Sequence, residues 1–143
     1  EARGIEFRRY DVYHDADRGE KRGENILTVC QMDGLEICHV GDLGHELTAE
    51  QAASIGEVDV LLLSVGGTFT VDATQATRVM ETLSPRVCIP MHYKTEKVDF
   101  PLAPVDEFLK GKQTVKRMDK STVEIDAGLL PKEREIWVLT PAL

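Results

Sequence analysis

The most constraining feature of this chain is an apolar stretch, Val58–Val65, that reads Val-Asp-Val-Leu-Leu-Leu-Ser-Val. A strand with so few polar residues is typical of a sheet that is covered on both faces. A helix is expected after it, from a cap at Asp72 to about Leu83, and then a second apolar strand at Val87–Tyr93. This order of strand, helix and strand predicts an α/β layered fold with a partly parallel sheet.

Short local signals place the other elements. Asp33-Gly34 between two apolar runs predicts a two-residue hairpin turn, and a glutamine three residues after Thr48 and after Asp72 has capping-box spacing. The other expected elements are strands at Ile5–Tyr13, Ile26–Met32 and Leu35–Val40, helices at Thr48–Gly56 and Pro104–Leu109, and terminal strands at Thr114–Met118, Thr122–Ile125 and Glu135–Leu139, where Trp137 is a packing residue. A chain of 143 residues can bury one core, so residues 1–143 are expected to form a single domain.

Composition narrows the class of partner. Hydrophobic residues make up 42% and charged residues 29% of the chain, as in an ordinary soluble globular protein. The net charge of −8 argues against a nucleic-acid or anionic-membrane surface, since neither would attract it. No apolar run approaches ~18 residues, and the N-terminus has no signal-peptide pattern. A cytoplasmic protein without nucleic-acid or membrane partners is therefore expected.

The three cysteines are expected to be reduced. With a two-residue hairpin turn, Cys30 would pair with Ile37, which places Cys38 on the opposite face of the ribbon. A disulfide between Cys30 and Cys38 is therefore disfavoured, and buried thiols are the favoured interpretation.

Three apolar or amphipathic segments each finish on a side chain that can bind a metal. The terminal side chains are those of His14, Asp42 and His92. Strands that end on imidazoles or carboxylates deliver them to the sheet edge, where open α/β sheets commonly bind their ligands. The sequence therefore predicts one shared polar site, interpreted as a metal centre.

Each of the three residues also has a structural interpretation. His92 lies two residues after Pro90, which tends to mark a strand end, but it could be a core histidine bonded to a backbone carbonyl. Asp42 lies between Gly41 and Gly44, which permit close backbone approach to a ligand, but it could be a turn aspartate. His14 could be a surface histidine, or Asp15 could orient its imidazole.

Other polar residues carry weaker signals. His39 is expected to be structural and His45 is ambiguous. The run from Arg22 to Asn25 could hold an anionic group, although charged loops are usually only solvated. Thr68, after Gly66-Gly67, loosely resembles part of a phosphate loop. Lys94 lies near the end of the last long strand and is a candidate contact for an anionic substrate; the alternative is that it is simply an exposed lysine. Thr68 is also a candidate substrate contact.

The combination of segments is more specific than its parts. In chain order they are Tyr13-His14-Asp15, Arg22-Gly23-Glu24-Asn25, Gly41-Asp42-Leu43-Gly44-His45, Gly66-Gly67-Thr68-Phe69-Thr70 and Ile89-Pro90-Met91-His92-Tyr93-Lys94-Thr95. Together they resemble the later part of a metallo-β-lactamase-fold hydrolase, in the branch that includes ascorbate-6-phosphate lactonase and uncharacterised zinc-dependent hydrolases. The resemblance implies an α/β fold that is the C-terminal part of an αββα sandwich, with helices packed on a mixed sheet.

The resemblance also implies a cofactor and a reaction. In that family a His-x-His-x-Asp-His motif, a separate histidine, a bridging aspartate and a final histidine hold two metals. By motif position, His14 resembles the separate histidine, Asp42 the bridging carboxylate and His92 the final histidine. The expected metal is Zn2+, with Mn2+ and Fe2+ as alternatives. The metal would lower the pKa of a bound water toward ~7 and so supply hydroxide. Asp42, as the catalytic residue, would orient this hydroxide for the hydrolysis of a small ester, lactone or phosphoester.

One departure from the family is severe, because the chain contains no His-x-His-x-Asp-His motif. It also begins without methionine, close to a strand-like segment. Both observations suggest a fragment that carries part of a dinuclear site and is inactive alone. The alternative function is a non-catalytic scaffold that forms a homo-oligomer or pairs with a chain carrying the missing half, since an open sheet favours such contacts.

Overall fold

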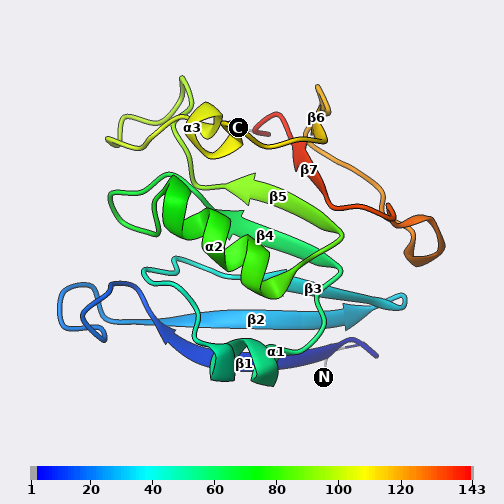
Figure 1. Ribbon diagram of the computed structural model, residues 1–143, viewed down its shortest axis with the longest axis horizontal. Helices are drawn as coiled ribbons and strands as arrows, with labels where there is room; N and C mark the ends of the chain where they lie inside the picture. Colours follow the sequence, from blue (N-terminus) through cyan, green and yellow to red (C-terminus); the bar gives the residue numbers. More distant parts are fainter. Residues whose placement is uncertain (1–2, 143) are drawn as a thin grey trace.

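The computed structural model describes residues 3–142 and contains one seven-stranded sheet with the order β1-β2-β3-β4-β5-β7-β6 (Figure 1). The elements in chain order are β1 (Glu6–Tyr13), β2 (Glu24–Met32), β3 (Leu35–His39), α1 (Ala49–Ile55), β4 (Val60–Ser64), α2 (Ala73–Leu83), β5 (Val87–Met91), α3 (Val105–Leu109), β6 (Val115–Arg117), the 3-10 turn η1 (Ala127–Leu129) and β7 (Glu135–Val138). Strands β1, β2 and β3 form antiparallel pairs, whereas the pairs from β3 to β6 are parallel. The predicted α/β fold with a mixed sheet is confirmed.

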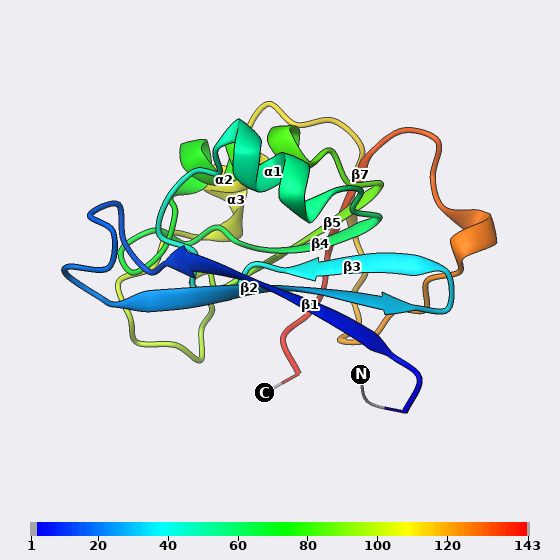
Figure 2. The ribbon, with the colours of Figure 1, turned by 90° about the horizontal axis from the view of Figure 1, so that it is seen from below.

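The three helices lie on one face of the sheet (Figure 2). Strand β4 has buried residues on both faces: Leu61 and Leu63 belong to the core under the helices, and Val60 belongs to a smaller cluster on the opposite face. The segment that includes Val123 and Ile125 packs against this smaller cluster. The apolar character of β4 therefore follows from cover on both sides, as the sequence predicts.

The predicted hairpin is present in the predicted register. Met32 pairs with Leu35 across a two-residue turn, in which Asp33 and Gly34 have φ angles of 52° and 78°. Positive φ at both turn residues is the type I′ geometry that matches the twist of the strands. Cys30 pairs with Ile37, and all three cysteines are free thiols.

Both predicted capping boxes are formed. The side chain of Thr48 accepts a hydrogen bond from the Gln51 amide at the start of α1, and Asp72 does the same for Gln75 at the start of α2. Each glutamine side chain accepts from the backbone amide of its cap residue in return. Among residues 3–142 no helix is long and apolar enough to cross a membrane.

Two sequence expectations differ from the structure. Thr122–Ile125 is not a strand; Val123 and Ile125 instead pack on the face of the sheet, with Glu124 exposed between them. Such packing produces the same alternation of apolar and polar residues as a strand, so the pattern alone does not distinguish the two. Strand β5 ends at Met91, because His92 has a positive φ of 55° that is incompatible with a strand.

Candidate metal centre

Three loops at one edge of the sheet carry the predicted site. Strands β1, β3 and β5 run in the same direction, so their carboxyl ends lie at the left of Figure 1. His14 follows β1, Asp42 follows β3 and His92 follows β5. The structure brings all three together: the distance from His14 Nε2 to Asp42 Oδ2 is 3.4 Å, and that from His92 Nε2 to Asp42 Oδ1 is 3.8 Å. One carboxylate therefore lies between two imidazoles and presents one oxygen to each.

These two separations are informative about chemistry. Both are longer than an ordinary hydrogen bond between nitrogen and oxygen, which spans about 2.7–3.2 Å. Two ligands of one tetrahedral zinc, each about 2.0–2.2 Å from the ion, lie ~3.4 Å apart. The donors are an aromatic nitrogen and a carboxylate oxygen, which are both zinc ligands. The arrangement fits a shared carboxylate with a metal on each side.

The ring of His14 has a second nitrogen that is not satisfied within the chain. Its Nδ1 is buried and has no hydrogen-bond partner among residues 3–142. Metal-binding histidines usually donate their other N–H to a carboxylate, a carbonyl or a water. The Nδ1 atom of His14 is available for such a partner. Within the described residues, no group of three or more His, Cys, Asp and Glu side chains is placed so that it could hold a metal ion.

Two polar residues that the sequence analysis did not single out position Asp42. The Asn25 side chain accepts a hydrogen bond from the Asp42 amide at 3.1 Å through Oδ1 and donates to the Val40 carbonyl at 2.8 Å. The fully buried hydroxyl of Ser64 donates to the Gly41 carbonyl at 2.7 Å. A serine within the apolar run of β4 is the signal that could have identified one of them, because a buried hydroxyl needs a partner.

Close backbone contacts position the two histidines. A Cβ on Gly44 would lie 2.1 Å from the carbonyl carbon of His14, and a Cβ on Gly66 would lie 2.1 Å from the carbonyl oxygen of His92. The Gly44 amide also donates to the Tyr13 carbonyl at 2.9 Å. These contacts hold the backbone of each histidine against a neighbouring loop. Gly44 and Gly66 therefore allow close contacts between loops, in addition to any approach of a ligand.

The remaining histidines have other roles. His45 Nε2 accepts from the Tyr13 amide at 3.1 Å, and its Nδ1 lies 2.7 Å from the Glu46 carbonyl, so the ring links two backbone segments. His39 is exposed, and its Nδ1 accepts from the Gly41 amide at 3.0 Å. The structural interpretation of His39 is thus supported, and His45 is resolved as structural.

Asp15 shapes the loop that follows His14. Its buried carboxylate accepts four backbone hydrogen bonds, from Asp17, Gly19, Lys21 and Arg22. Burial alone would raise the pKa of this carboxyl, but the four hydrogen bonds outweigh it and lower the pKa to about 2. Both Asp15 oxygens are used within the loop, so Asp15 orders the loop and does not bond to the His14 ring.

The two predicted substrate contacts are bonded to one neighbouring loop. The hydroxyl of Thr68 donates to the Pro101 carbonyl at 2.7 Å, and the ammonium of Lys94 donates to the carbonyls of Val98 and Phe100. Their roles toward a substrate stay predictions.

The cysteines are poor candidates for metal ligands here, because burial raises the pKa of Cys38 and of Cys88 to about 12 and keeps both as thiols.

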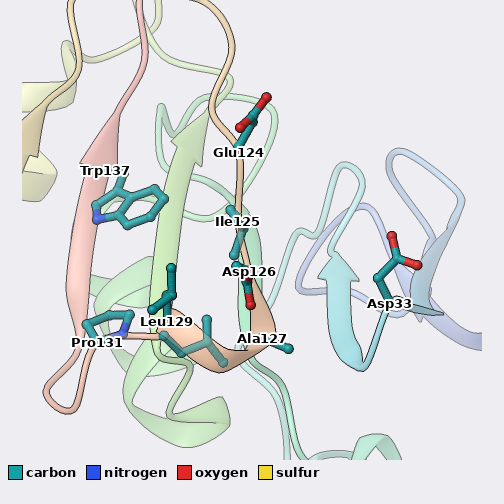
Figure 3. Close-up of a pocket in the computed structure, with 9 residues that line it drawn as sticks. Asp33, Glu124, Ile125, Asp126, Ala127, Leu129, Pro131 and Trp137 are labelled. Atoms are coloured by element: carbon teal, nitrogen blue, oxygen red, sulfur yellow. The ribbon is translucent and has the colours of Figure 1, made fainter.

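A cavity lies away from the candidate metal centre. It has a volume of about 680 Å³ and is lined by residues that include Asp33, Glu124 and Trp137 (Figure 3). Figure 3 shows the Trp137 ring on β7 facing the segment of Ile125, with Asp33 across from it on the hairpin turn. Asp33 precedes β3 whereas Asp42 follows it, so this cavity is at the opposite edge of the sheet from the candidate metal centre.

Comparison with known proteins gives the class of protein. A family profile described as "Beta-lactamase superfamily domain" matches residues 1–92, and the chain belongs to this family. The resemblance noted in the sequence is thereby confirmed.

Individual relatives support the same class of protein. A UPF0173 metal-dependent hydrolase from Archaeoglobus fulgidus is 31% identical over 82% of this chain and 52% of its own length. One from Pyrobaculum islandicum is 34% identical over 72% of this chain and 42% of its own length. A crystal structure from Thermotoga maritima, provisionally described as a Zn-dependent hydrolase of the metallo-β-lactamase superfamily, is 40% identical, with a TM-score of 0.83 over 96% of this chain and 66% of that one. The chain spans about half or less of the length of the curated relatives it matches.

Proposed function

We propose that this chain carries part of the active site of a metal-dependent hydrolase, with His14, Asp42 and His92 as ligands. The observation that carries the proposal is the position of the Asp42 carboxylate between two Nε2 atoms, at 3.4 Å and 3.8 Å. Relatives named metal-dependent hydrolases, and a structural neighbour described as Zn-dependent, support it. Zinc is the metal we propose, since imidazole and carboxylate are both among its usual ligands.

A bound zinc would act as a Lewis acid that lowers the pKa of water and polarises an ester carbonyl or phosphoryl group. The chain contributes the donors and their alignment. Asn25 accepts from the Asp42 amide and Ser64 donates to the preceding carbonyl, so the backbone at Asp42 is held in place without a metal. This preorganisation leaves the two oxygens of Asp42 facing the two imidazoles.

The site is open enough for a small substrate. The side chains of His14, His92 and Asp42 are 22%, 33% and 51% exposed. We propose small esters, lactones or phosphoesters as the substrate class, hydrolysed by hydroxide that Asp42 orients. Each metal would have two ligands from the described residues, with Asp42 shared, so the chain alone is proposed to bind zinc weakly.

Zinc titration tests this function without relying on activity. Calorimetry of the chain should detect zinc binding, and Asp42→Asn should weaken it at least ~10-fold, because a ligand is removed from both positions. Asp33→Asn is the matched control; it lies on the distant hairpin turn, where asparagine is well tolerated, and should leave zinc affinity unchanged. Equal affinities for Asp42→Asn and the parent chain would refute the proposed site. Hydrolysis of a small ester by the zinc-loaded chain, compared between the same variants, is the second readout.

A further inference from the structure

A row of three side chains connects three loops at the edge that carries the candidate metal centre. The guanidinium carbon of Arg22 lies 5.8 Å from the ring centre of Phe69, and the Phe69 ring meets the Phe100 ring edge-on at 5.8 Å between centres. The three residues come from the loops after β1, β4 and β5. We refer to Arg22, Phe69 and Phe100 as the Arg-Phe row.

Backbone contacts tie this row to the predicted metal ligands. The carbonyl of Gly23, next to Arg22, accepts from the His14 amide at 3.0 Å. The amide of Val71, in the Phe69 loop, donates at 2.9 Å to the carbonyl of Leu43, which is next to Asp42. The row therefore belongs to the same loop assembly as the candidate metal centre.

Phe100 extends the row toward His92. Both residues line a cavity of about 550 Å³ between the end of β5 and the C-terminal segment around Leu139. The remaining lining is largely apolar and includes Ile89 and Leu102. An apolar body held on Phe100 would thus have room beside a predicted metal ligand.

The guanidinium of Arg22 is not paired with a carboxylate in the described chain; its contact there is with the Phe69 ring. Arg8, Arg78 and Arg117 each form an ion pair with a carboxylate, but the guanidinium of Arg22 has no hydrogen-bond or ion-pair partner among residues 3–142. Lys94, the cation that the sequence favoured for an anionic substrate, is bonded to carbonyls of its own loop. Arg22 is therefore the better candidate for an anion contact at this edge.

The exposure of Phe100 also favours a ligand site at this edge. Phe100 is 61% exposed although it contacts Phe69. An exposed ring and a guanidinium without a carboxylate partner, both next to Phe69, favour a ligand that is apolar at one end and anionic at the other. Arginine suits such a site, because its planar group stacks on a ring while its edge donates to a carboxylate or phosphate.

We propose that the Arg-Phe row binds the substrate of the proposed hydrolase, and that this substrate is an amphiphilic anion. Arg22 contacts its carboxylate or phosphate group, and Phe69 and Phe100 contact its apolar or aromatic body. This inference rests on the proposed function for the identity of the ligand as a substrate, but binding itself requires no metal.

Ligand titration of the metal-free chain tests the row. The probes are phenyl phosphate, benzoate, inorganic phosphate and phenol, with binding followed by chemical-shift changes. We expect phenyl phosphate or benzoate to bind about tenfold more tightly than inorganic phosphate or phenol, because only the first two engage both Arg22 and the rings. The tighter of the two identifies the preferred anion. Equal affinities for all four probes would overturn the proposal.

Variants assign the binding to the row. Arg22→Met should weaken binding of the preferred probe about tenfold, and Phe69→Leu should weaken it without changing the affinity for inorganic phosphate. Arg18→Met is the matched control, since Arg18 is an exposed arginine of the same loop without a contact to Phe69. Equal losses for Arg18→Met and Arg22→Met, or no loss for Arg22→Met with its melting temperature unchanged, would refute the assignment.

One further variant separates this proposal from the proposed function. In Asp42→Asn, zinc affinity should fall while the metal-free chain keeps its affinity for the preferred probe. Probe binding at Arg22 in a chain that binds no zinc would refute the metal site and leave the anion site standing. Zinc binding without any effect of Arg22→Met on the probe would do the reverse.

Discussion

At the scale of single residues, two glycines decide where the candidate ligands lie. Gly44 and Gly66 contact the backbones of His14 and His92 so closely that no Cβ fits. The geometry of the metal centre therefore depends on residues that carry no side chain.

Gly44→Ala tests this dependence. Its new Cβ would lie 2.1 Å from the His14 carbonyl carbon, so the two loops must separate. We expect a loss of about 3 kcal/mol in the free energy of unfolding, the upper end of ordinary overpacking, measured by urea denaturation. Zinc affinity should fall as well. Gly128→Ala is the control, because Gly128 is exposed and its Cβ would lie 3.2 Å only from the mobile end of the exposed Asp126 side chain, so stability should change by less than about 0.5 kcal/mol. Equal stabilities of the two variants would contradict this account.

Asp15 makes the loop after β1 sensitive to acid. Its pKa of about 2 lies below the ordinary value of 3.8, so its contribution to stability is complete above about pH 4. That contribution is lost as the pH falls toward 2, where the carboxyl becomes protonated and four backbone amides lose a charged acceptor.

The chain has 25 acidic residues, so the test is a difference between variants. We expect the gap in melting temperature between the parent chain and Asp15→Asn to be largest above pH 4 and to close as the pH approaches 2. Asp11→Asn, at an exposed position of β1, should show no such gap. A gap that stays constant with pH would mean that the charge of Asp15 does not stabilise the loop.

The residues of the candidate site differ in how far the sequence predicts them. His14, Asp42 and His92 each follow a strand, so the strand pattern predicts that they lie at one edge of the sheet, whereas their approach to one another depends on the loops. Asn25 and Ser64 act through hydrogen bonds between loops that are remote in sequence, at 17 and 23 residues of separation. The serine within the apolar run signals that Ser64 needs a partner, but no local pattern identifies the partner of either residue, so the two bonds required the tertiary structure.

At the scale of elements, helix α2 has the strongest local signals. Asp72 caps its first turn, and the residues that it buries are Ala76, Val79, Met80 and Leu83. Periodicity and caps act within one element, which is why this helix was predicted to within one residue. The segment Thr122–Ile125 was predicted wrongly, because its alternating pattern arises from packing on a sheet face and not from pairing at a sheet edge.

The cap of α2 can be tested by substitution. Asp72→Ala removes the acceptor for the Gln75 amide and should lower the free energy of unfolding by about 1 kcal/mol. Asp72→Asn keeps an acceptor of similar strength and should be nearly neutral. Thermal or urea denaturation of the two variants provides the measurement; equal losses would show that the carboxylate acts through its charge and not as a cap.

At the scale of the whole molecule, the sheet is covered unequally. The helices pack on one face, whereas on the opposite face the buried cluster centres on Val60 of β4 and on Val87 and Ile89 of β5. Over β1 and β2 that face presents Phe7, Ile26 and Met32, which are 47%, 37% and 38% exposed. Phe7 pairs with Cys30, and Ile26 and Met32 alternate with the buried Leu27 and Val29, so the three exposed side chains share one face. We refer to these three residues as the open face.

An apolar surface of this kind on a sheet favours contact with another chain. We propose that the open face mediates self-association, and we expect the sedimentation coefficient to rise with protein concentration.

Ile26→Thr keeps a β-branched residue in β2 but removes apolar surface, so it should weaken the association. Phe100→Ser removes a more exposed apolar side chain from the loop after β5, outside the open face, and should leave the association unchanged. A chain that stays monomeric at all concentrations, or loses association equally in both variants, would exclude the open face as the contact. Retention of zinc binding in Ile26→Thr would further separate this surface from the candidate metal centre.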